Sequence, residues 1–586
     1  MKRLGVALAT TLMFMSAKAA TAGCTLARMF EFPVTMHGMA PWTNVKINGQ
    51  DEWLMIDSGA VFSTLSPAKA AELHLDLEPA PFEVMGVGGV APHTDAATVR
   101  TMTISGITAP RVQFLVVAHG ASGSAGLLGQ NILDIADVDY DLAHGWVRIM
   151  KAQDCGRAAL AYWDKEKVYS VLDQEGVVER DHHTYAYVTV NGVRLKALLD
   201  TGAGSSVIAL RGAARAGLRP AMEGAKPLGV SYGIGGATGM SWSVPVASIK
   251  IGDEEIKNDR IEIGDLDLED EDMLLGADFF LAHHVYVANS QGRIYFTYNG
   301  GRVFNLTPSA PDTASGASKD ADEPGDAESH SRRGSALAAR EDDEPAIAEY
   351  TKAIQLKPDE GRYYVQRAQA HLRLGQRAAA TSDLDEALKR QPANVEALVA
   401  RAELRTGGQD QAGAAHDLDA ASAAVAAQAD IRLRIAHDDV ALERFDLAIA
   451  ELDRWIPAHL DEVAIFEAYN VRCWARASLG RDLDKALDDC NRSVRRNRNA
   501  GNLDSRGLVH LRRGEYDQAI EDYNAALALQ AKMAWSLYGR GVAKIHKGER
   551  AAGELDIAAA KAIQPKIVEI ARSRGIVAPA SPPPSN

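Results

Sequence analysis

The sequence predicts a multidomain protein, in which an all-β half precedes an all-α helical solenoid. Its 586 residues are too many for one domain. Residues 28–305 contain short β-branched or alternating runs such as VQFLVV and RIYFTY, separated by glycines, which is typical of strands and turns. From about residue 327 alanine, leucine, arginine and glutamate recur at helical spacing. Residues 306–326 are rich in Pro, Ser, Asp and Gly, so we predict a disordered linker there.

The two ends of the chain carry segments outside these halves. Lys2 and Arg3 precede a short apolar run and then small residues, A-K-A at 17–19 and A-T-A at 20–22. This pattern predicts a signal peptide over residues 1–22. We therefore expect an exported protein that is either located in a bacterial periplasm or secreted. The tail at 577–586 ends in SPPPSN and is expected to be disordered.

Charge and hydropathy limit the class of partner. The formal net charge of −15 argues against nucleic acid or an anionic membrane as the main partner. The apolar run near the N-terminus is too short to span a bilayer, and no later run reaches the required length, so we expect no membrane span.

The β-rich half contains an internal duplication. Four landmarks recur in the same order: an Asn-Gly turn, a loop with an aspartate, a glycine-rich turn and the tripeptide LLG. They lie at 48–49, 56–60, 86–89 and 127–129 in the first copy, and at 191–192, 199–203, 233–236 and 274–276 in the second. A serine, Ser63 or Ser206, follows each aspartate at the same interval. The spacing from the aspartate to the last glycine is also nearly equal in the two copies.

The repeated aspartates, Asp57 and Asp200, suggest a specific chemistry. A hydrophobic strand that ends in Asp-Ser/Thr-Gly fixes a carboxylate at the end of a rigid element, and the glycine allows two such loops to approach. Two carboxylates held together share one proton, because both cannot readily ionise. The ionised partner can take a proton from water while the protonated partner polarises an amide carbonyl.

On these residues the β-rich half resembles the retropepsin-like aspartic proteases, whose pattern combines φφ-D-[ST]-G-A, a glycine-rich flap and a φφG motif. The resemblance implies a bilobal, pseudo-two-fold fold, with lobe 1 at 24–160 and lobe 2 at 161–305. It implies a catalytic dyad of Asp57 and Asp200, a polypeptide substrate and no cofactor or metal. The loop-supporting residues would be Ser58, Gly59, Thr201 and Gly202, and the flap residues would be Gly86, Gly88, Gly89, Gly233, Gly235 and Gly236. Ser58 stands where the second copy has threonine but keeps the hydroxyl.

Other candidate sites are weaker. His182-His183 and His283-His284 lack metal-ligand spacing, so we expect surface or strand-edge roles for them. The acidic run at 265–272 lacks the glycine of an EF-hand turn and is interpreted as a solvated loop before the second LLG.

The helical half, residues 327–576, resembles tetratricopeptide repeats (TPR), a helix-pair unit of about 34 residues. Arg506 and Arg540 are one such period apart, as are Pro358 and Pro392. Small residues recur at packing positions with a large residue between them: Ala346, Tyr350 and Ala353; Ala380, Leu384 and Ala387; Ala519, Tyr523 and Ala526. We expect about seven units, least regular over 395–465, and a terminal cap at 568–576. Such an array normally presents a surface to a protein partner, and a spacer or a dimerisation surface is the alternative.

The four cysteines are expected to form two disulfides in an oxidising compartment. Cys473 and Cys490 fall on the two helices of one repeat, where two buried free thiols are the alternative. Cys24 and Cys155 bracket lobe 1. Since T-A-G-C at 21–24 faintly resembles a lipoprotein cleavage box, a lipid anchor at Cys24 is the alternative to that bridge.

The leading hypothesis is therefore an exported aspartic endopeptidase whose TPR domain recruits a protein partner or substrate. A non-catalytic peptide-binding scaffold is the alternative. A protease active only as a dimer of chains is a third hypothesis, made unnecessary by the duplication within one chain.

Overall fold

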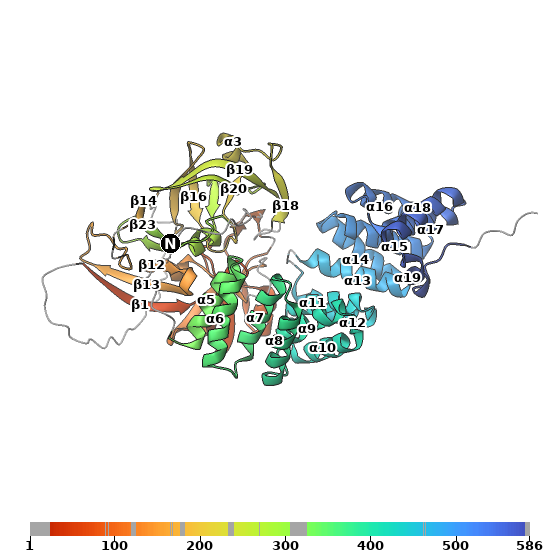
Figure 1. Ribbon diagram of the computed structural model, residues 1–586, viewed down its shortest axis with the longest axis horizontal. Coiled ribbons are helices and arrows are strands. Elements are labelled where there is room, and N and C mark those ends of the chain that lie inside the picture. The colour runs from red at the N-terminus through yellow and green to blue at the C-terminus, as the bar shows by residue number, and fades with distance from the viewer. Residues whose placement is uncertain are drawn as a thin grey trace, which may run out of the picture. The chain divides into compact units, whose positions relative to one another are not determined.

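The computed structural model describes residues 24–87, 89–91, 93–118, 125–164, 166, 168–175, 182–231, 239–268, 270–304, 325–460, 462 and 464–579. Strands make up the first half of these residues and helices the second (Figure 1). Within these ranges no helix combines the length and apolar character that crossing a membrane requires. The predicted signal peptide at 1–22, most of the predicted linker and most of the tail lie outside the described residues.

The first lobe is an eight-stranded sheet in the order β2-β3-β4-β11-β5-β10-β9-β6. A further pairing between β3 and β9 closes the sheet on itself. Its strands are β2 (Thr35–His37), β3 (Ala40–Ile47), β4 (Gln50–Ile56), β5 (Thr64–Leu65), β6 (Leu77–Pro79), β9 (Asp95–Ile104), β10 (Ile107–Val116) and β11 (Gly126–Leu128). Helices α1 (Pro67–Glu72) and α2 (Gln130–Leu133) and a small hairpin, β7 (Met85–Gly86) with β8 (Gly89–Val90), complete the lobe.

The second lobe repeats this design with seven strands in the order β15-β16-β21-β17-β20-β19-β18, closed by a pairing of β15 with β19. These strands are β15 (Tyr185–Val190), β16 (Val193–Leu199), β17 (Val207–Ala209), β18 (Lys226–Ser231), β19 (Gly239–Ile251), β20 (Glu254–Gly264) and β21 (Met273–Leu275). Helices α3 (Leu210–Arg215) and α4 (Ala277–Ala282) correspond to α1 and α2 of the first lobe.

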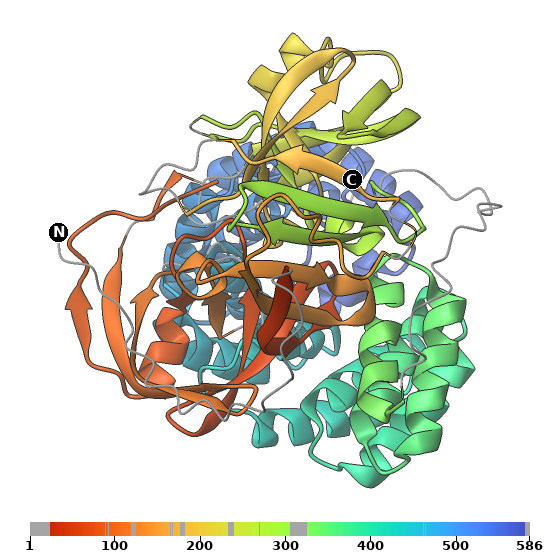
Figure 2. The same ribbon diagram turned by 90° about the vertical axis from the view of Figure 1, so that its left-hand side faces the viewer.

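A six-stranded sheet joins the two lobes (Figure 2). Its order is β1-β13-β12-β22-β23-β14, formed by β1 (Thr25–Pro33), β12 (Asp137–Asp141), β13 (Trp146–Gln153), β14 (Ser170–Asp173), β22 (His283–Ala288) and β23 (Arg293–Tyr298). A one-turn 3-10 helix, η1 (Leu142–His144), links β12 to β13. The lobes meet where β12 pairs with β22, with Val138 opposite Val287 and Tyr140 opposite Val285. These side chains are buried, so the junction belongs to one core.

The two Asn-Gly turns set the register of the strands that deliver the aspartates. Asn48 and the glycine after it have φ values of 52° and 88°, and Asn191 and its glycine have 48° and 82°. Two consecutive positive φ values define the tight hairpin turn that this dipeptide favours. Each asparagine side chain also accepts backbone N–H groups from a neighbouring strand, including those of Thr101 and Ser248 at 3.2 Å. The turn therefore fixes β3 to β4 in one lobe and β15 to β16 in the other.

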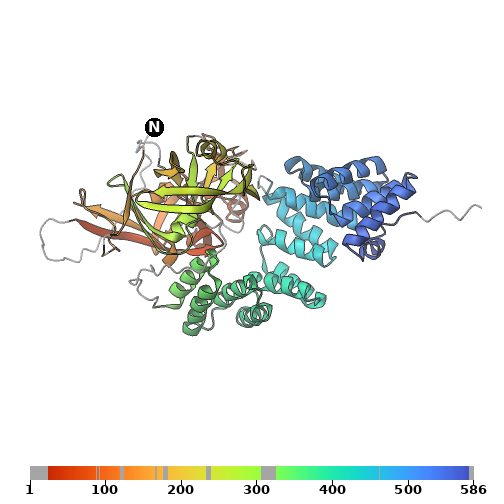
Figure 3. The same cartoon turned by 45° about the horizontal axis from the view of Figure 1, so that its top comes forward.

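From Ala327 onwards the described residues form seven helix pairs and a final helix. These helices are coloured green to blue in Figure 3. The pairs are α5 (Ala327–Ala339) with α6 (Asp343–Leu356), α7 (Gly361–Arg373) with α8 (Arg377–Arg390), α9 (Val395–Gly407) with α10 (Gln411–Ala424), α11 (Ile431–Ala441) with α12 (Phe445–Trp455), α13 (Ile465–Leu479) with α14 (Leu483–Arg496), α15 (Ala500–Arg513) with α16 (Tyr516–Leu529), and α17 (Ala534–His546) with α18 (Arg550–Ile563). The last helix is α19 (Ile567–Ser573), and a 3-10 turn, η2 (Ile456–Ala458), follows α12. The small and large residues at the predicted packing positions are buried.

The chain divides into two compact units, residues 1–391 and 392–586, so helices α5 to α8 belong with the strands. Helix α5 packs on the first lobe: the Ser335 hydroxyl accepts the Met36 N–H at 3.0 Å, and the Arg332 guanidinium lies 4.3 Å from the Trp146 ring centre. The first helix begins at Ala327, and the first two helix pairs of the predicted repeat region belong to the same compact unit as the strands. Asp326, assigned to the linker, caps α5 by accepting the Ser329 N–H.

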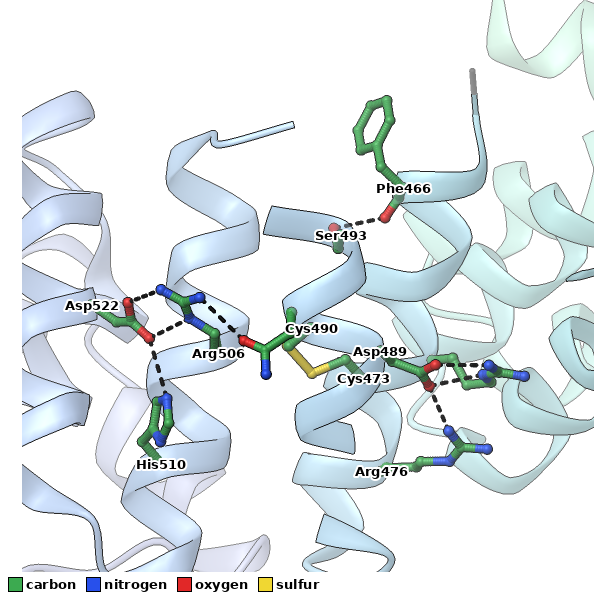
Figure 4. Close-up of a disulfide and its surroundings, with 11 residues drawn as sticks. Phe466, Cys473, Arg476, Asp489, Cys490, Ser493, Arg506, His510 and Asp522 are labelled. Carbon is green, nitrogen blue, oxygen red and sulfur yellow. Dashed lines mark hydrogen bonds and ion pairs between the residues drawn. A yellow bond between two sulfur atoms is a disulfide. The ribbon is translucent and has the colours of Figure 1, made fainter. Parts of the chain in front are cut away.

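Both expected cysteine pairs are disulfides. Cys24, just before β1, joins Cys155, just after β13, at one edge of the six-stranded sheet. Cys473 on α13 joins Cys490 on α14 within one helix pair (Figure 4). Both half-cystines of the second bridge are fully buried, so the bridge fastens the two helices inside their core.

Candidate active site

The two repeated aspartates lie at the ends of equivalent strands. Asp57 follows β4 and Asp200 follows β16. The N–H of Asp57 donates to the Leu128 carbonyl at 3.0 Å, and the N–H of Asp200 donates to the Leu275 carbonyl at 2.9 Å. Those two leucines end β11 and β21, which run parallel to β4 and β16. The LLG sequences therefore hold each aspartate-bearing strand from its side.

The two aspartate-bearing loops are cross-linked by their hydroxyl residues. The Ser58 hydroxyl donates to the Leu199 carbonyl at 2.8 Å and accepts the Thr201 N–H at 2.9 Å. The Thr201 hydroxyl donates to the Ile56 carbonyl at 2.8 Å and accepts the Ser58 N–H at 3.0 Å. All four bonds cross from one lobe to the other and are buried. They satisfy groups that would be costly to leave unpaired, and so fix the distance between the loops.

Glycine is required next to each aspartate because the opposite carboxylate occupies the space. A Cβ atom on Gly59 would lie 2.5 Å from Cγ of Asp200, and one on Gly202 would lie 2.5 Å from Cγ of Asp57. Each loop therefore packs its glycine directly on the aspartate of the other lobe. The structure brings the two carboxyl groups, which are far apart in the chain, into one site.

The electrostatics of this pair favour a shared proton. Burial raises the pKa of Asp57 well above its usual value, and the charge of Asp200 raises it further. Burial also raises the pKa of Asp200, but the Gly202 N–H, at 2.8 Å, and a hydrogen bond from Asp57 oppose that rise. The proton therefore stays preferentially on Asp57, and Asp200 is the partner that ionises more readily.

A second polar layer supports each loop, and sequence reasoning missed half of it. In lobe 1 the Ser63 hydroxyl accepts the Gly129 N–H at 3.0 Å and donates to Oδ1 of Asn131 at 2.8 Å. In lobe 2 the Ser206 hydroxyl accepts the Gly276 N–H at 2.9 Å and donates to Oδ1 of Asp278 at 2.6 Å. The serines were noted as landmarks of the duplication. Their partners, Asn131 and Asp278, each stand two residues after the LLG glycine, and this shared spacing was the available signal.

His183 is a further residue at the site that sequence reasoning did not assign to it. Its Nε2 lies 3.0 Å from the Gly59 carbonyl oxygen, and its Nδ1 lies 3.1 Å from the Tyr185 hydroxyl. A carbonyl can only accept, so Nε2 carries a hydrogen. The positive charge that His183 can carry lowers the pKa of Asp200. This side chain of lobe 2 therefore holds the lobe 1 loop and favours an ionised Asp200.

Exposed apolar side chains accompany the first flap. Gly86 and Gly89 pair at the end of the β7–β8 hairpin, which also carries the exposed Met85. The rings of Phe62, beyond the active-site loop, and Phe82, before the hairpin, stack with centres 5.5 Å apart while both stay more than two-fifths exposed. Gly88 and the second flap's Gly233, Gly235 and Gly236 lie outside the described residues.

The histidine pairs have mixed placements. His182 is exposed and lies 2.8 Å from Asp134, which fits the surface role expected of it. The surface or strand-edge role expected of His283 and His284 is wrong, because both are buried in β22, which lies between β12 and β23 in the joining sheet. His284 lies between the Asp139 carboxylate, at 2.5 Å, and a stacked tryptophan ring. Burial there is possible because the carboxylate pairs with the imidazole.

Comparison with known protein families matches this geometry. A family model for aspartyl protease covers residues 43–132, and one for the aspartyl protease of gag polyproteins covers residues 186–282. Each match contains one of the two aspartates. Tetratricopeptide repeat models match residues 327–360, 361–394 and 507–548.

The chain carries two aspartyl protease domains followed by tetratricopeptide repeats. Both families recognised from the sequence are thereby confirmed, and so is the predicted combination of a β-rich bilobal region with a helical TPR solenoid.

Individual relatives each match only part of the chain. The human Protein SGT1 homolog is 41% identical over 59 residues, which is 10% of this chain and 16% of that protein. A tetratricopeptide repeat protein from Parabacteroides merdae is 15% identical and covers 43% of this chain and 98% of its own, with a TM-score of 0.33. One chain in the structure of the APC/C hetero-tetramer Cut9–Hcn1 is 13% identical, and the match covers 43% of this chain and 49% of that chain, with a TM-score of 0.33.

Proposed function

We propose that this chain is an exported aspartic endopeptidase in which Asp57 and Asp200 form a single catalytic dyad. The observation that carries the proposal is the juxtaposition of two buried carboxyl groups, one from each protease domain, held by reciprocal bonds between Ser58 and Thr201. A pair that retains one proton can act as acid and base in the same step. One chain supplies both halves, so the site needs no second chain.

The proposed reaction follows from the different proton affinities of the two carboxyls. Asp200 removes a proton from a water molecule, whose oxygen adds to the scissile carbonyl carbon, while the Asp57 proton passes to the carbonyl oxygen. The resulting gem-diol then loses the amine: a hydroxyl proton returns to Asp57 as the carbonyl reforms, and the proton on Asp200 passes to the leaving nitrogen. Water is consumed, the C–N bond breaks, and the dyad regains its starting protonation.

The surroundings of the site favour apolar polypeptide substrates. Phe62, Phe82 and Met85 expose apolar surface around the first flap, and buried contact with substrate side chains would stabilise a bound chain. The TPR repeats would recruit a protein partner or position the substrate, since stacked helix pairs present an extended binding surface. Export rests on the N-terminal sequence alone, and a lipid anchor is disfavoured because Cys24 is in a disulfide.

The test is cleavage of a mixture of peptides and an unfolded protein by the full chain, from mildly acidic to neutral pH. Asp57→Asn and Asp200→Asn should each lower kcat at least 100-fold, the order that loss of acid–base catalysis produces. Asp278→Asn is a matched control: it removes a buried carboxylate of lobe 2 that lies off the dyad. It should keep most of the activity, and a pepstatin-like inhibitor should block the wild type.

Cleavage that survives either dyad substitution would contradict the assignment. Absence of cleavage by the wild type under every condition, combined with peptide binding, would instead support the non-catalytic scaffold.

A further inference from the structure

The helical array loses its regular spacing at one place. Four of the connections between successive helix pairs contain three or four residues, whereas 425–430 contains six and 456–464 contains nine. Most helix pairs contain the same internal ion pair, in which an arginine on the first helix binds an aspartate on the second. Arg367 and Arg401, and later Arg472, Arg506 and Arg540, occupy this position.

Successive arginines are one repeat apart on each side of the irregularity, but the interval from Arg401 to Arg472 is slightly longer than two repeats. The intervening pair, α11 with α12, has isoleucine at this position and uses Arg432 with Glu451 instead. One long connection precedes this pair, between α10 and α11, and the other follows it, between α12 and α13.

The two long connections bring together three metal-ligating side chains. Asp430 ends the first connection, and His459 and Glu462 lie in the second. Nε2 of His459 lies 3.1 Å from a carboxylate oxygen of Asp430 and 3.9 Å from one of Glu462. One ligand atom from each residue lies within 4.8 Å of the other two. All three residues belong to the second compact unit.

The imidazole is fixed in the orientation that a metal ligand needs. Its Nδ1 lies 2.6 Å from the Trp455 carbonyl oxygen, and since a carbonyl only accepts, Nδ1 carries a hydrogen. The ring also stacks on the Trp455 indole with centres 3.9 Å apart and planes 6° from parallel. The His459 side chain is fully buried. A backbone carbonyl that accepts from one ring nitrogen while the other faces acidic groups is the usual outer shell of a histidine ligand.

The charges around Nε2 are those of a site that attracts a cation. The Asp430 and Glu462 side chains are partly buried, with relative exposures of 29% and 14%, and both have a carboxylate oxygen within 4 Å of Nε2 of His459. Two partly buried carboxylates with one imidazole between them leave negative charge that a divalent ion would neutralise.

We propose that Asp430, His459 and Glu462 bind a divalent transition-metal ion of the Zn²⁺ class and that this ion closes the two long connections. Zinc accepts imidazole nitrogen and carboxylate oxygen at about 2.0–2.2 Å, which places neighbouring tetrahedral ligands about 3.4 Å apart. The separations of 3.1 and 3.9 Å bracket that value. Three protein ligands leave the fourth position for water.

The alternative to a metal ion is a proton on Nε2: a doubly protonated, positively charged His459 would pair with both carboxylates. The two occupants differ at Nε2, because a zinc ion requires a lone pair there whereas an ion pair requires a hydrogen, and the zinc titration below distinguishes them. The metal site would add a rigid cross-link between α11 and α13 where the repeat spacing breaks. The proposal does not depend on the protease activity.

The experiment titrates ZnCl₂ into the full-length, untagged protein after treatment with a chelator, by isothermal titration calorimetry. We expect one Zn²⁺ per chain with a Kd in the micromolar range or tighter, and a rise in Tm that the chelator reverses. His459→Asn keeps a donor near the Trp455 carbonyl but removes Nε2, and Glu462→Gln keeps the shape but removes a charge. Each should weaken binding at least tenfold, the low end of the effect of losing a supporting residue.

The matched control is His510→Asn. His510 also faces two carboxylates, Glu515 at 2.6 Å and Asp522 at 3.7 Å, but both already pair with arginines. This change should leave zinc binding unaltered. Circular dichroism checks that each variant is folded. If one of them is not, Asp430→Asn is used in its place, because the Asp430 side chain makes no capping hydrogen bond to α11. The proposal is overturned if the wild type takes up no stoichiometric zinc, or if folded His459 and Glu462 variants bind it as tightly as the wild type.

Discussion

At the scale of single residues, the active-site loops depend on hydroxyl groups more than on the identity of the residues that carry them. Ser58 and Thr201 make the same pair of bonds to the opposite lobe. The methyl group of Thr201 is therefore dispensable for the cross-link, and its hydroxyl is not. This explains how the two copies differ here without loss of the pseudo-two-fold arrangement.

Thr201→Val tests this dependence, because valine keeps the shape of threonine and removes both hydrogen bonds. The buried Ser58 N–H would lose its acceptor and the Ile56 carbonyl its donor. We expect the free energy of unfolding to fall by about 1–3 kcal/mol, and kcat to fall because the loops lose their fixed spacing. Thr201→Ser, measured in the same urea titration and peptide assay, should stay close to wild type. Equal stability and activity in the two variants would refute the role given to the hydroxyl.

The proton shared by the dyad predicts a bell-shaped pH dependence. Activity should fall at high pH as Asp57, whose pKa is raised, loses its proton, and at low pH as Asp200 gains one. Because both folded-state pKa values are raised, the dyad stabilises the fold most in its protonated form, and this contribution is lost as the pH rises through them. Asp57→Asn should therefore flatten the fall of Tm with rising pH. A pH–rate profile with no alkaline limb would contradict the shared proton.

At the scale of elements, each aspartate-bearing strand is held by the short LLG strand and the helix after it. Lobe 1 places Asn131 under its loop where lobe 2 places Asp278, and both accept from a serine hydroxyl. The carboxylate of Asp278 is buried, and this burial raises its pKa to about 6 despite the N–H groups that it accepts. The Asn131 amide of lobe 1 accepts the equivalent serine hydroxyl, and it carries no charge that burial would destabilise.

Asp278→Asn should therefore be tolerated, and its effect should depend on pH. A rise of the folded-state pKa from 3.8 to about 6 means that the stabilising contribution is complete below the lower value and lost as the pH rises through the higher one. Ionisation in the folded state then costs on the order of 3 kcal/mol. We expect the variant to gain stability relative to wild type at pH 8 but not at pH 3. Thermal unfolding at both values decides this, and a variant that loses stability at pH 8 would contradict the assignment.

The parts of the fold that were predictable are those with a local signal. The Asn-Gly turns, the two aspartate loops and the LLG strands each use a few adjacent residues whose types dictate the conformation. The joining sheet has no such signal, because the pairing of β12 with β22 connects residues that are far apart in the chain. His183 was missed for the same reason: its partner, the Gly59 carbonyl, belongs to the other lobe. Buried His283 and His284 were misjudged because their burial depends on that sheet.

At the scale of the whole molecule, the first repeat helices are part of the protease unit. Ala336 and Ala339 of α5 are buried in the same core as Val34 and Met36. The linker composition correctly marks a change from strands to helices but carries no information about which surface the first helix will cover. Compactness is set by such long-range contacts, which is why the division falls after residue 391 instead of at the linker.

Ala336→Asp tests this attachment, because it would place a charge in the core between α5 and the first lobe. The cost of burying an unpaired carboxylate should lower the Tm of the full chain and reduce peptide cleavage. Ala558→Asp makes the same change at an exposed position of α18 and should leave both unaltered. Equal Tm and activity in the two variants would show that α5 does not stabilise the protease lobes.

The central claim is that one chain contains one complete site, built from Asp57 of the first domain and Asp200 of the second. Mixing equal amounts of purified Asp57→Asn and Asp200→Asn chains tests it most directly. If both aspartates act within a chain, every molecule in the mixture lacks one of them, and peptide cleavage stays at the level of the separate variants. Recovery of a substantial fraction of wild-type activity on mixing would mean that the site forms between chains, and would contradict the account.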